Sequence, residues 1–188
     1  CNKLRRAFDS VIKQSHADFE WVILLNNGAN FKDIDILPDM HKHLKGKFTI
    51  YDIKDLSGAK DNGFIGNYKR ICCSLCTGDV LVELDYDDAL EPNCLEVLNE
   101  HFQNSDIDFV YSSCFEYKNG KCVAPFPEKF GWKYEKCPST GRIITKAFEP
   151  TPINFNYIWF APNHVRAWRK SFYNKIGGHH PELDVCDD

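Results

Sequence analysis

The sequence lacks any apolar run close to the roughly 20 residues that a membrane-spanning helix requires, so we expect no transmembrane segment. We expect no secretory leader in this sequence either, because it opens with the charged segment CNKLRRAFDS. Positive charge is not in excess: the formal net charge is −4, which argues against nucleic acid as a partner. What is present is ordinary globular composition, with a length of 188 residues that suits one hydrophobic core.

The nine cysteines lack the even, paired pattern of a disulfide framework. Cys73 and Cys76 form a CxxC, but no second CxxC or HxxxH lies at the spacing of a zinc finger. We therefore expect buried, reduced thiols that pack as small hydrophobes. Reduced thiols predict a cytoplasmic location, and peripheral attachment to a membrane through further parts of a longer protein stays open.

Hydrophobic periodicity predicts an α/β domain with a largely parallel sheet. Predicted helices cover residues 2–15, 34–44, 66–76, 92–102 and 166–176, and predicted strands cover 21–27, 48–53, 80–84 and 157–160. Lys118-Asn119-Gly120 between two apolar segments predicts a β-hairpin within residues 109–126. Residues 127–152 have no periodicity and are interpreted as a long irregular segment, of the kind that is often functional.

The segment VLVELDYDDALEP is the most informative part of the sequence. An apolar strand delivers Asp85, Asp87 and Asp88 to its carboxyl end, where ligands bind in open α/β sheets. Clustered like charges are unfavourable unless a cation neutralises them, and carboxylate oxygens suit Mg²⁺ or Mn²⁺. The alternative is a solvated acidic turn in which Asp88 caps the helix that begins near Pro92.

Four ordered segments of the chain resemble family 2 of the GT-A glycosyltransferases. ELDYDD resembles the family's DxD motif, Thr77-Gly78-Asp79 the turn before it, and WVILLNNGAN its second strand with a DDGS-like turn. Asn163–Asp188 resembles the acceptor-side block, in which a helix and a GG turn lead to an acidic catalytic pair. The resemblance implies a GT-A (Rossmann-like) fold, with a mixed, mostly parallel central sheet flanked by helices.

The resemblance also implies an inverting, metal-dependent transfer from a nucleotide-diphospho-sugar donor. Asp87 matches the direct ligand of Mn²⁺ or Mg²⁺, and Asp85 matches the residue that holds the ribose or binds the metal through water. Lys69 or Arg70 falls where the family often has a basic residue facing the phosphates. For each of these two basic residues, a solvated helix face is the alternative.

The other implied site residues lie at the turns of the matched segments. Asn26 and Asn27 stand where the family has the DDGS carboxylates, so the preference for a base need not be uridine. Asp188 matches the general base that deprotonates the acceptor hydroxyl, with Asp187 beside it. His179 is a candidate further metal ligand, and a surface histidine beside the glycine turn is its alternative.

The chain as a whole is predicted to be a single catalytic domain over residues 1–188, cut from a longer protein at both ends. Residues 1–105 form the predicted nucleotide-sugar-binding half, and residues 106–188 the acceptor-side half. The acceptor is a glycan, a lipid-linked sugar or another hydroxyl compound, and Trp132 is the aromatic residue expected to contact it. The alternatives are a non-catalytic nucleotide- or sugar-binding domain and a nucleotidyltransferase.

Overall fold

The computed structural model describes residues 2–156 and 164–184. These residues belong to two compact units: unit 1 comprises residues 1–108 and 168–188, and unit 2 comprises residues 109–167. The chain thus leaves unit 1 close to the predicted division between residues 105 and 106 and returns to it at residue 168. Whether the whole forms one catalytic domain stays a prediction.

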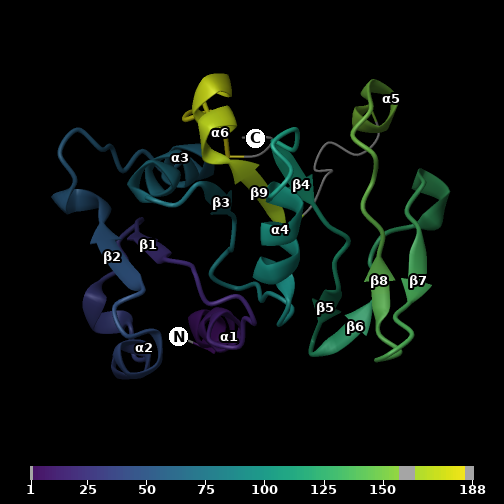
Figure 1. Cartoon of the computed structure of the whole chain (residues 1–188), viewed down its shortest axis with the longest axis horizontal. Coiled ribbons are helices and arrows are strands. Elements are labelled where there is room, and N and C mark those ends of the chain that lie inside the picture. Colours follow the sequence, from purple (N-terminus) through teal and green to yellow (C-terminus); the bar gives the residue numbers. More distant parts are fainter. Residues whose placement is uncertain (1, 157–163, 185–188) are drawn as a thin grey trace. The chain divides into compact units, whose positions relative to one another are not determined.

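Unit 1 alternates helices and strands, as the sequence pattern predicts (Figure 1). In chain order its elements are α1 (Asn2–Val11), β1 (Trp21–Leu25), the 3-10 helix η1 (Phe31–Asp33), α2 (Leu37–Leu44), β2 (Phe48–Asp52), the 3-10 helix η2 (Ile53–Asp55), α3 (Ile65–Leu75), β3 (Val80–Val82), α4 (Cys94–Phe102) and α6 (Lys170–Ile176). Strands β1 and β2 pair in parallel, with Trp21 opposite Phe48 and Leu25 opposite Asp52.

The main core of unit 1 lies against the β1–β2 pair. Its buried side chains come from α1, β1, α2 and the segment before α2, namely Phe8, Val11, Leu25, Ile34, Ile36, Met40 and Leu44. Phe8 and Met40 are 1% and 0% exposed, as expected for apolar side chains on the inward face of a helix. This core holds the carboxyl end of β1 in place, where the Asn26-Asn27 turn begins.

Strand β9 (Arg166–Arg169) corrects one sequence prediction, because a helix was expected from residue 166. The first four residues are extended, and α6 begins only at Lys170. In the second sheet β9 is the neighbour of β3. Its carboxyl end is fixed within unit 1, where Arg169 N donates to Asp108 O and Lys170 N donates to Asp79 O, both at 2.8 Å.

Unit 2 consists of short strands. Its elements are β4 (Phe109–Tyr111), β5 (Glu116–Lys118), β6 (Lys121–Val123), the 3-10 helix η3 (Glu128–Phe130), β7 (Tyr134–Lys136), β8 (Ile143–Thr145) and α5 (Pro152–Phe155). The β5–β6 hairpin is confirmed, and Asn119 and Gly120 at its turn have φ of 52° and 74°. The prediction of an irregular segment over residues 127–152 was wrong, because β7 and β8 pair in a second antiparallel hairpin.

Trp132 belongs to a small aromatic core of unit 2. It is 6% exposed, stacks on Phe126 with ring centroids 4.3 Å apart, and meets Phe148 edge-on at 4.7 Å. The predicted contact between Trp132 and an acceptor is therefore wrong, since its neighbours already cover the indole.

The predicted strand over residues 157–160 lies outside the described residues. Among the residues that are described, no helix has the length and apolar character needed to cross a bilayer.

Candidate functional site

The acidic turn, residues 85–88, follows β3 directly. Leu81 in the middle of β3 is 3% exposed, so the strand is anchored in unit 1 and the carboxylates come after its buried end. Asp88 N donates to Asp85 O at 3.0 Å and closes the turn. Three carboxylates of one turn repel one another unless positive charge compensates them. The local geometry therefore creates a demand for cations at this point.

Helix α1 supplies two such cations, Lys3 and Arg6. Lys3 Nζ lies 2.9 Å from Asp87 Oδ2, and Arg6 donates from its guanidinium to the backbone oxygen of Asp87. The Lys3 amine also lies 3.3 Å from the Tyr86 hydroxyl. The hydrogen bonds to Asp87 and Tyr86 raise the pKa of Lys3 above its ordinary value. Because the Lys3 and Asp87 side chains are 54% and 39% exposed, this pair is open to exchange with another cation.

The turn after β1 carries the two asparagines that were predicted to face the nucleotide base. Asn27 has a φ of 50° and Gly28 a φ of 82°, and Ala29 N donates to Asn26 O at 3.0 Å. This left-handed backbone suits asparagine and glycine, which explains the residue types found there. The Asn27 side chain is exposed, and that of Asn26 is half-buried. Their role in base recognition stays a prediction.

The two basic residues proposed for the phosphates lie in different environments on α3. Arg70 is exposed. Lys69 is 17% exposed, and its Nζ lies 3.2 Å from Glu83 Oε2. The structure thus brings Lys69 to the residue that joins β3 to the acidic turn, whereas Arg70 remains available to a solvent-borne ligand.

Glu83 is a residue that the sequence analysis missed. Its side chain is buried, with the residue 8% exposed, and Trp168 Nε1 donates to Glu83 Oε1 at 2.9 Å. The signal was present in the sequence, since a glutamate interrupts the otherwise apolar run VLVEL. A buried carboxylate is costly unless donors and positive charge surround it. Here Lys69 and Trp168 supply both.

His179 reaches the same carboxylate from the turn after α6. It is 1% exposed, Nε2 lies 3.3 Å from Glu83 Oε1 without the alignment of a hydrogen bond, and Nδ1 lies 2.6 Å from the Tyr173 hydroxyl. His179 N donates to the same hydroxyl at 3.1 Å. We call Lys69, Glu83, Trp168, Tyr173 and His179 the buried polar network. Metal binding by His179 stays a prediction, and these contacts support a role within the network instead.

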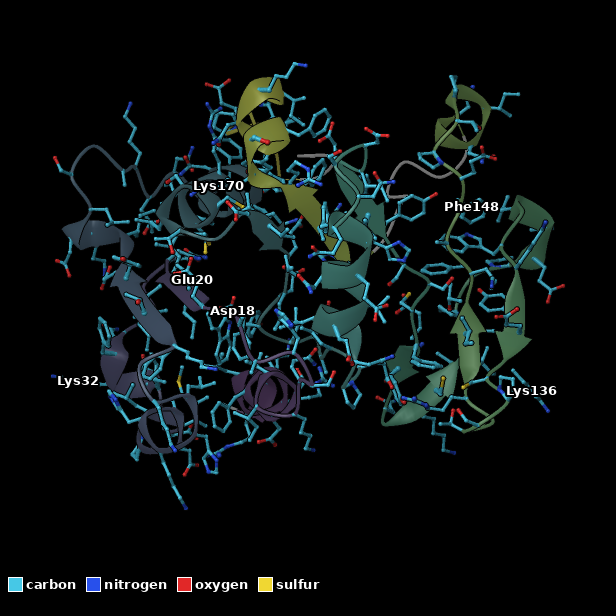
Figure 2. The ribbon with its side chains drawn as sticks, in the orientation of Figure 1. Asp18, Glu20, Lys32, Lys136, Phe148 and Lys170 are labelled. Carbon is cyan, nitrogen blue, oxygen red and sulfur yellow. The ribbon has the colours of Figure 1, made fainter. Side chains whose placement is uncertain are left out.

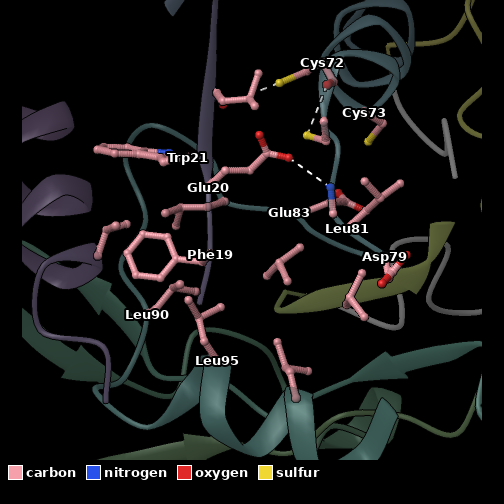
Figure 3. A pocket seen from close by; sticks show the side chains of 18 of the residues that line it. Phe19, Glu20, Trp21, Cys72, Cys73, Asp79, Leu81, Glu83, Leu90 and Leu95 are labelled. Carbon is pink, nitrogen blue, oxygen red and sulfur yellow. Dashed lines mark hydrogen bonds between the residues drawn. The ribbon is translucent and has the colours of Figure 1, made fainter. Parts of the chain in front are cut away.

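A cavity of about 570 Å³ lies between β1 and β3 (Figure 3). Its apolar lining comes from both strands, from the segment before β1, and from α4 with the segment before it. It includes Phe19, Trp21, Val22, Val80, Leu81, Val82, Leu90, Leu95 and Leu98. Lys69, Glu83 and Asp85 also line it. The cavity is therefore an apolar space that reaches the first carboxylate of the acidic turn.

Glu20, which directly precedes β1, also lines this cavity (Figures 2 and 3). Its carboxylate accepts from Thr77 N, from Thr77 Oγ1 at 2.8 Å and from Gly78 N at 3.0 Å. Burial alone would raise the pKa of Glu20, but these hydrogen bonds outweigh it and lower that pKa below its ordinary value. Glu20 thereby ties the start of β1 to the turn before β3.

The thiols beside the cavity are of the structural kind that was predicted. Burial raises the pKa of Cys73 to about 12 and that of Cys76 to about 11, so both remain protonated at neutral pH. All seven cysteines of the described residues are free. Cys137 in unit 2 departs from the prediction, because hydrogen bonds with Ser139 and Thr140 lower its pKa to about 7.

The predicted catalytic residues Asp187 and Asp188 lie outside the described residues. The segment just before them is anchored on the amino-terminal end of α3. Ile65 N donates to Asp184 Oδ1 at 3.1 Å, and Gly66 N donates to Leu183 O at 3.0 Å. These bonds satisfy helix amides that would otherwise lack acceptors.

Solved structures share this fold. A crystal structure of Staphylococcus aureus TarS residues 1–349 matches with a TM-score of 0.65 and 15% identity, over 98% of this chain and 48% of TarS 1–349. A second S. aureus TarS structure matches with a TM-score of 0.65 and 16% identity, over 98% of this chain and 29% of that one. The predicted GT-A architecture, a mixed α/β fold with parallel strands and flanking helices, is confirmed.

Relatives with curated names point the same way. An uncharacterized glycosyltransferase of Nostoc sp. (strain PCC 7120) is 29% identical over 106 residues, which are 55% of this chain and 30% of the relative. An uncharacterized glycosyltransferase of Methanocaldococcus jannaschii is 28% identical over 134 residues, 69% of this chain and 43% of the relative. The chain thus spans less than half of either. The family model described as glycosyl transferase family 2 matches residues 1–177, and the chain belongs to this family.

Proposed function

We propose that this chain is the catalytic part of a glycosyltransferase that moves a sugar from a nucleotide-diphospho-sugar to an acceptor hydroxyl with inversion. The observation that carries the proposal is the acidic turn at the buried end of β3, in a chain of glycosyl transferase family 2. The donor supplies a diphosphate, and a carboxylate cluster that demands cations fits a metal-bound diphosphate. A glycan, a lipid-linked sugar or another hydroxyl compound is the proposed acceptor.

A divalent cation fits the acidic turn by the chemistry of its donors. Asp85 and Asp87 offer carboxylate oxygens, the ligands that Mg²⁺ and Mn²⁺ prefer. Asp87 already binds the ammonium group of Lys3 at 2.9 Å, so its oxygen accepts a cation in this conformation. When bound, the metal would offset the charge that develops on the departing nucleoside diphosphate.

The remaining contacts with the sugar-nucleotide donor are assigned to the turn after β1 and to helix α3. Asn26 and Asn27 follow the carboxyl end of β1, and their amides can donate to and accept from a nucleotide base. The exposed Arg70 suits the phosphates better than Lys69, which is held by Glu83. In this proposal Asp85 also holds the ribose.

Catalysis is assigned to the acidic pair at residues 187 and 188. Asp188 removes the proton of the acceptor hydroxyl as that oxygen attacks the anomeric carbon, with Asp187 beside it. Attack opposite the leaving nucleotide inverts the configuration at that carbon. The assignment draws on the family resemblance of the segment that ends in these two residues and on the anchoring of Leu183 and Asp184 at α3.

The test is calorimetric titration of the full-length protein with a panel of nucleoside diphosphates and sugar nucleotides, with and without Mn²⁺. We expect one nucleotide to bind in a metal-dependent manner, and Asp87→Asn to weaken it by tenfold or more. Asp106→Asn removes an exposed carboxylate of unit 1 outside the acidic turn and should bind as wild type does. Binding that ignores both Mn²⁺ and Asp87→Asn would refute the metal assignment.

Product analysis separates the alternatives. Release of a nucleoside diphosphate together with a glycosylated acceptor supports the transferase. Release of pyrophosphate indicates a nucleotidyltransferase. Metal-dependent binding without turnover of any tested donor indicates a binding module, for which the asparagines in place of the usual carboxylates at the Asn26-Asn27 turn are the supporting observation.

A further inference from the structure

One member of the buried polar network, Glu83, lies two positions before the first carboxylate of the acidic turn. Glu83 is 8% exposed at the end of an apolar strand, a position where an apolar side chain would avoid the cost of burying a carboxylate. Polar groups in such places define one geometry, because each donor must meet its acceptor. Only Leu84 separates Glu83 from Asp85, so the geometry of one constrains the other.

Three elements of unit 1 converge on the Glu83 carboxylate. Lys69 reaches it from α3, at 3.2 Å from Oε2, and Trp168 reaches it from β9, at 2.9 Å from Oε1. His179 reaches it from the turn after α6, at 3.3 Å from Oε1. The end of β3 is therefore linked by side chains to the helix α3 that precedes it and to a strand and a turn that follow much later in the sequence.

Tyr173 extends the network one step further from the acidic turn. Its hydroxyl is 2.6 Å from His179 Nδ1 and accepts from His179 N at 3.1 Å, so it fixes both the ring and the backbone of that residue. Gly178 leaves room for this ring, because a Cβ at residue 178 would lie 2.5 Å from its Cε1 atom. Through its contacts with His179, the Tyr173 hydroxyl is linked to Glu83 and so to the acidic turn.

We propose that Glu83, His179 and Tyr173 are positioning residues that fix the acidic turn in the conformation that binds the metal and the donor diphosphate. The inference rests on the proposed function of that turn. It assigns His179 to the support of the site rather than to the metal itself. Residues that orient metal ligands from behind typically change metal affinity by roughly 10–100-fold when they are substituted.

The test compares Mn²⁺-dependent nucleotide binding by full-length wild type, Glu83→Gln, Tyr173→Phe and the double variant. Both substitutions keep the shape of the side chain, and Tyr173→Phe removes one hydroxyl only. The matched control is Tyr134→Phe in unit 2, which also removes one hydrogen-bonded hydroxyl, here with a bond from Phe126 N at 2.9 Å and one to Phe126 O at 2.8 Å. Melting temperatures of all variants report any general loss of stability.

We expect each single variant to raise the Kd for the Mn²⁺–nucleotide complex about tenfold. The double variant should be about as weak as Glu83→Gln alone, because the two residues act in one chain of contacts. Tyr134→Phe should keep the wild-type Kd even where its melting temperature falls as far as that of Tyr173→Phe.

Two results overturn the inference while the proposed function stands. One is a wild-type Kd in Glu83→Gln and Tyr173→Phe, and the other is a double variant about a hundredfold weaker than wild type, as for independent residues. If the wild-type protein itself shows no metal-dependent binding, the proposed function fails, and the inference falls with it.

Discussion

The two glycines after α6 offer a matched pair of substitutions that tests the packing beneath the site. Gly177 has a φ of 89°, and a Cβ added there would have nothing within 4 Å, so Gly177→Ala adds only backbone strain, about 1–2 kcal/mol. Gly178 has a φ of 67°, and its added Cβ would lie 2.5 Å from Cε1 and 2.8 Å from the hydroxyl oxygen of Tyr173. Gly178→Ala must therefore add the displacement of a buried ring to the same strain.

Two costs at Tyr173 separate the Gly178→Ala variant from Gly177→Ala. Tyr173 is 5% exposed, and overpacking of a buried site costs roughly 1–3 kcal/mol. Displacing its hydroxyl also sacrifices the contacts with His179, worth about 1 kcal/mol. We expect Gly178→Ala to destabilise the protein by about 2–4 kcal/mol more than Gly177→Ala.

Urea unfolding followed by tryptophan fluorescence measures this difference. The rings of Trp168 and Tyr173 lie 5.9 Å apart, so the indole reports on the displaced ring. With a slope of about 2 kcal/mol per molar urea, the midpoint of Gly178→Ala should lie roughly 1–2 M below that of Gly177→Ala. Equal midpoints would refute the packing of Tyr173 against residue 178, and with it the fixed position of the His179 ring.

Three further predictions concern other parts of the chain. Cys137, with a pKa of about 7, should be alkylated by iodoacetamide at pH 7 in the native protein, while Cys73, with a pKa of about 12, should stay unlabelled. Mass spectrometry of the labelled peptides measures this, and equal labelling of the two cysteines would contradict the prediction. The lowered pKa of Glu20 stabilises the fold above the unfolded-state pKa of about 4.3, and this contribution is lost as the pH falls through the folded-state value. Glu20→Gln should therefore lower the free energy of unfolding at pH 7, by about 1 kcal/mol or less because the carboxylate is exposed. The loss of unfolding free energy should be smaller at pH 3, and an equal loss at both pH values in urea unfolding would contradict the role of the ionised carboxylate. Trp132→Ala should destabilise unit 2 by about 3–5 kcal/mol, as measured by native-state hydrogen exchange. The control Lys133→Ala, at an exposed side chain, should change the stability of unit 2 by less than about 0.5 kcal/mol. Similar losses of stability in both variants would show that the indole is not part of a core.

Local pattern was enough to predict the parts of the fold that place the acidic turn. The apolar runs over residues 21–25 and 80–82 specify buried strands by themselves, and the polar residues that follow them necessarily lie at the carboxyl ends. The β5–β6 hairpin was equally predictable, since Asn119 and Gly120 accept the positive φ that a two-residue turn requires. In these places the side chain and the conformation are coupled within a few residues.

The misinterpreted segments depend on partners that are distant in sequence. Arg166–Arg169 reads as the start of a helix, yet its carboxyl end is bonded to Asp79 and Asp108, and no local pattern indicates those partners. The strands β7 and β8 have three residues each, too few for an alternating pattern to emerge. Trp132 shows the same limit, because Phe148, which helps to bury it, lies 16 positions away.

Charge compensation around the acidic turn has two different characters, and the difference bears on how the site works. Lys3 pairs with Asp87 at the surface, with the lysine side chain 54% exposed, and such pairs contribute little and exchange readily with other cations. Lys69 pairs with Glu83 in the interior, with these side chains 17% and 6% exposed. Removing one partner there would leave the other charge buried without compensation. In the proposed function, the exposed Lys3–Asp87 pair would therefore open to admit a divalent cation with its diphosphate, while the buried Lys69–Glu83 pair would stay closed. The exposed pair would leave the turn accessible to ligand, and the buried pair would hold the turn in place.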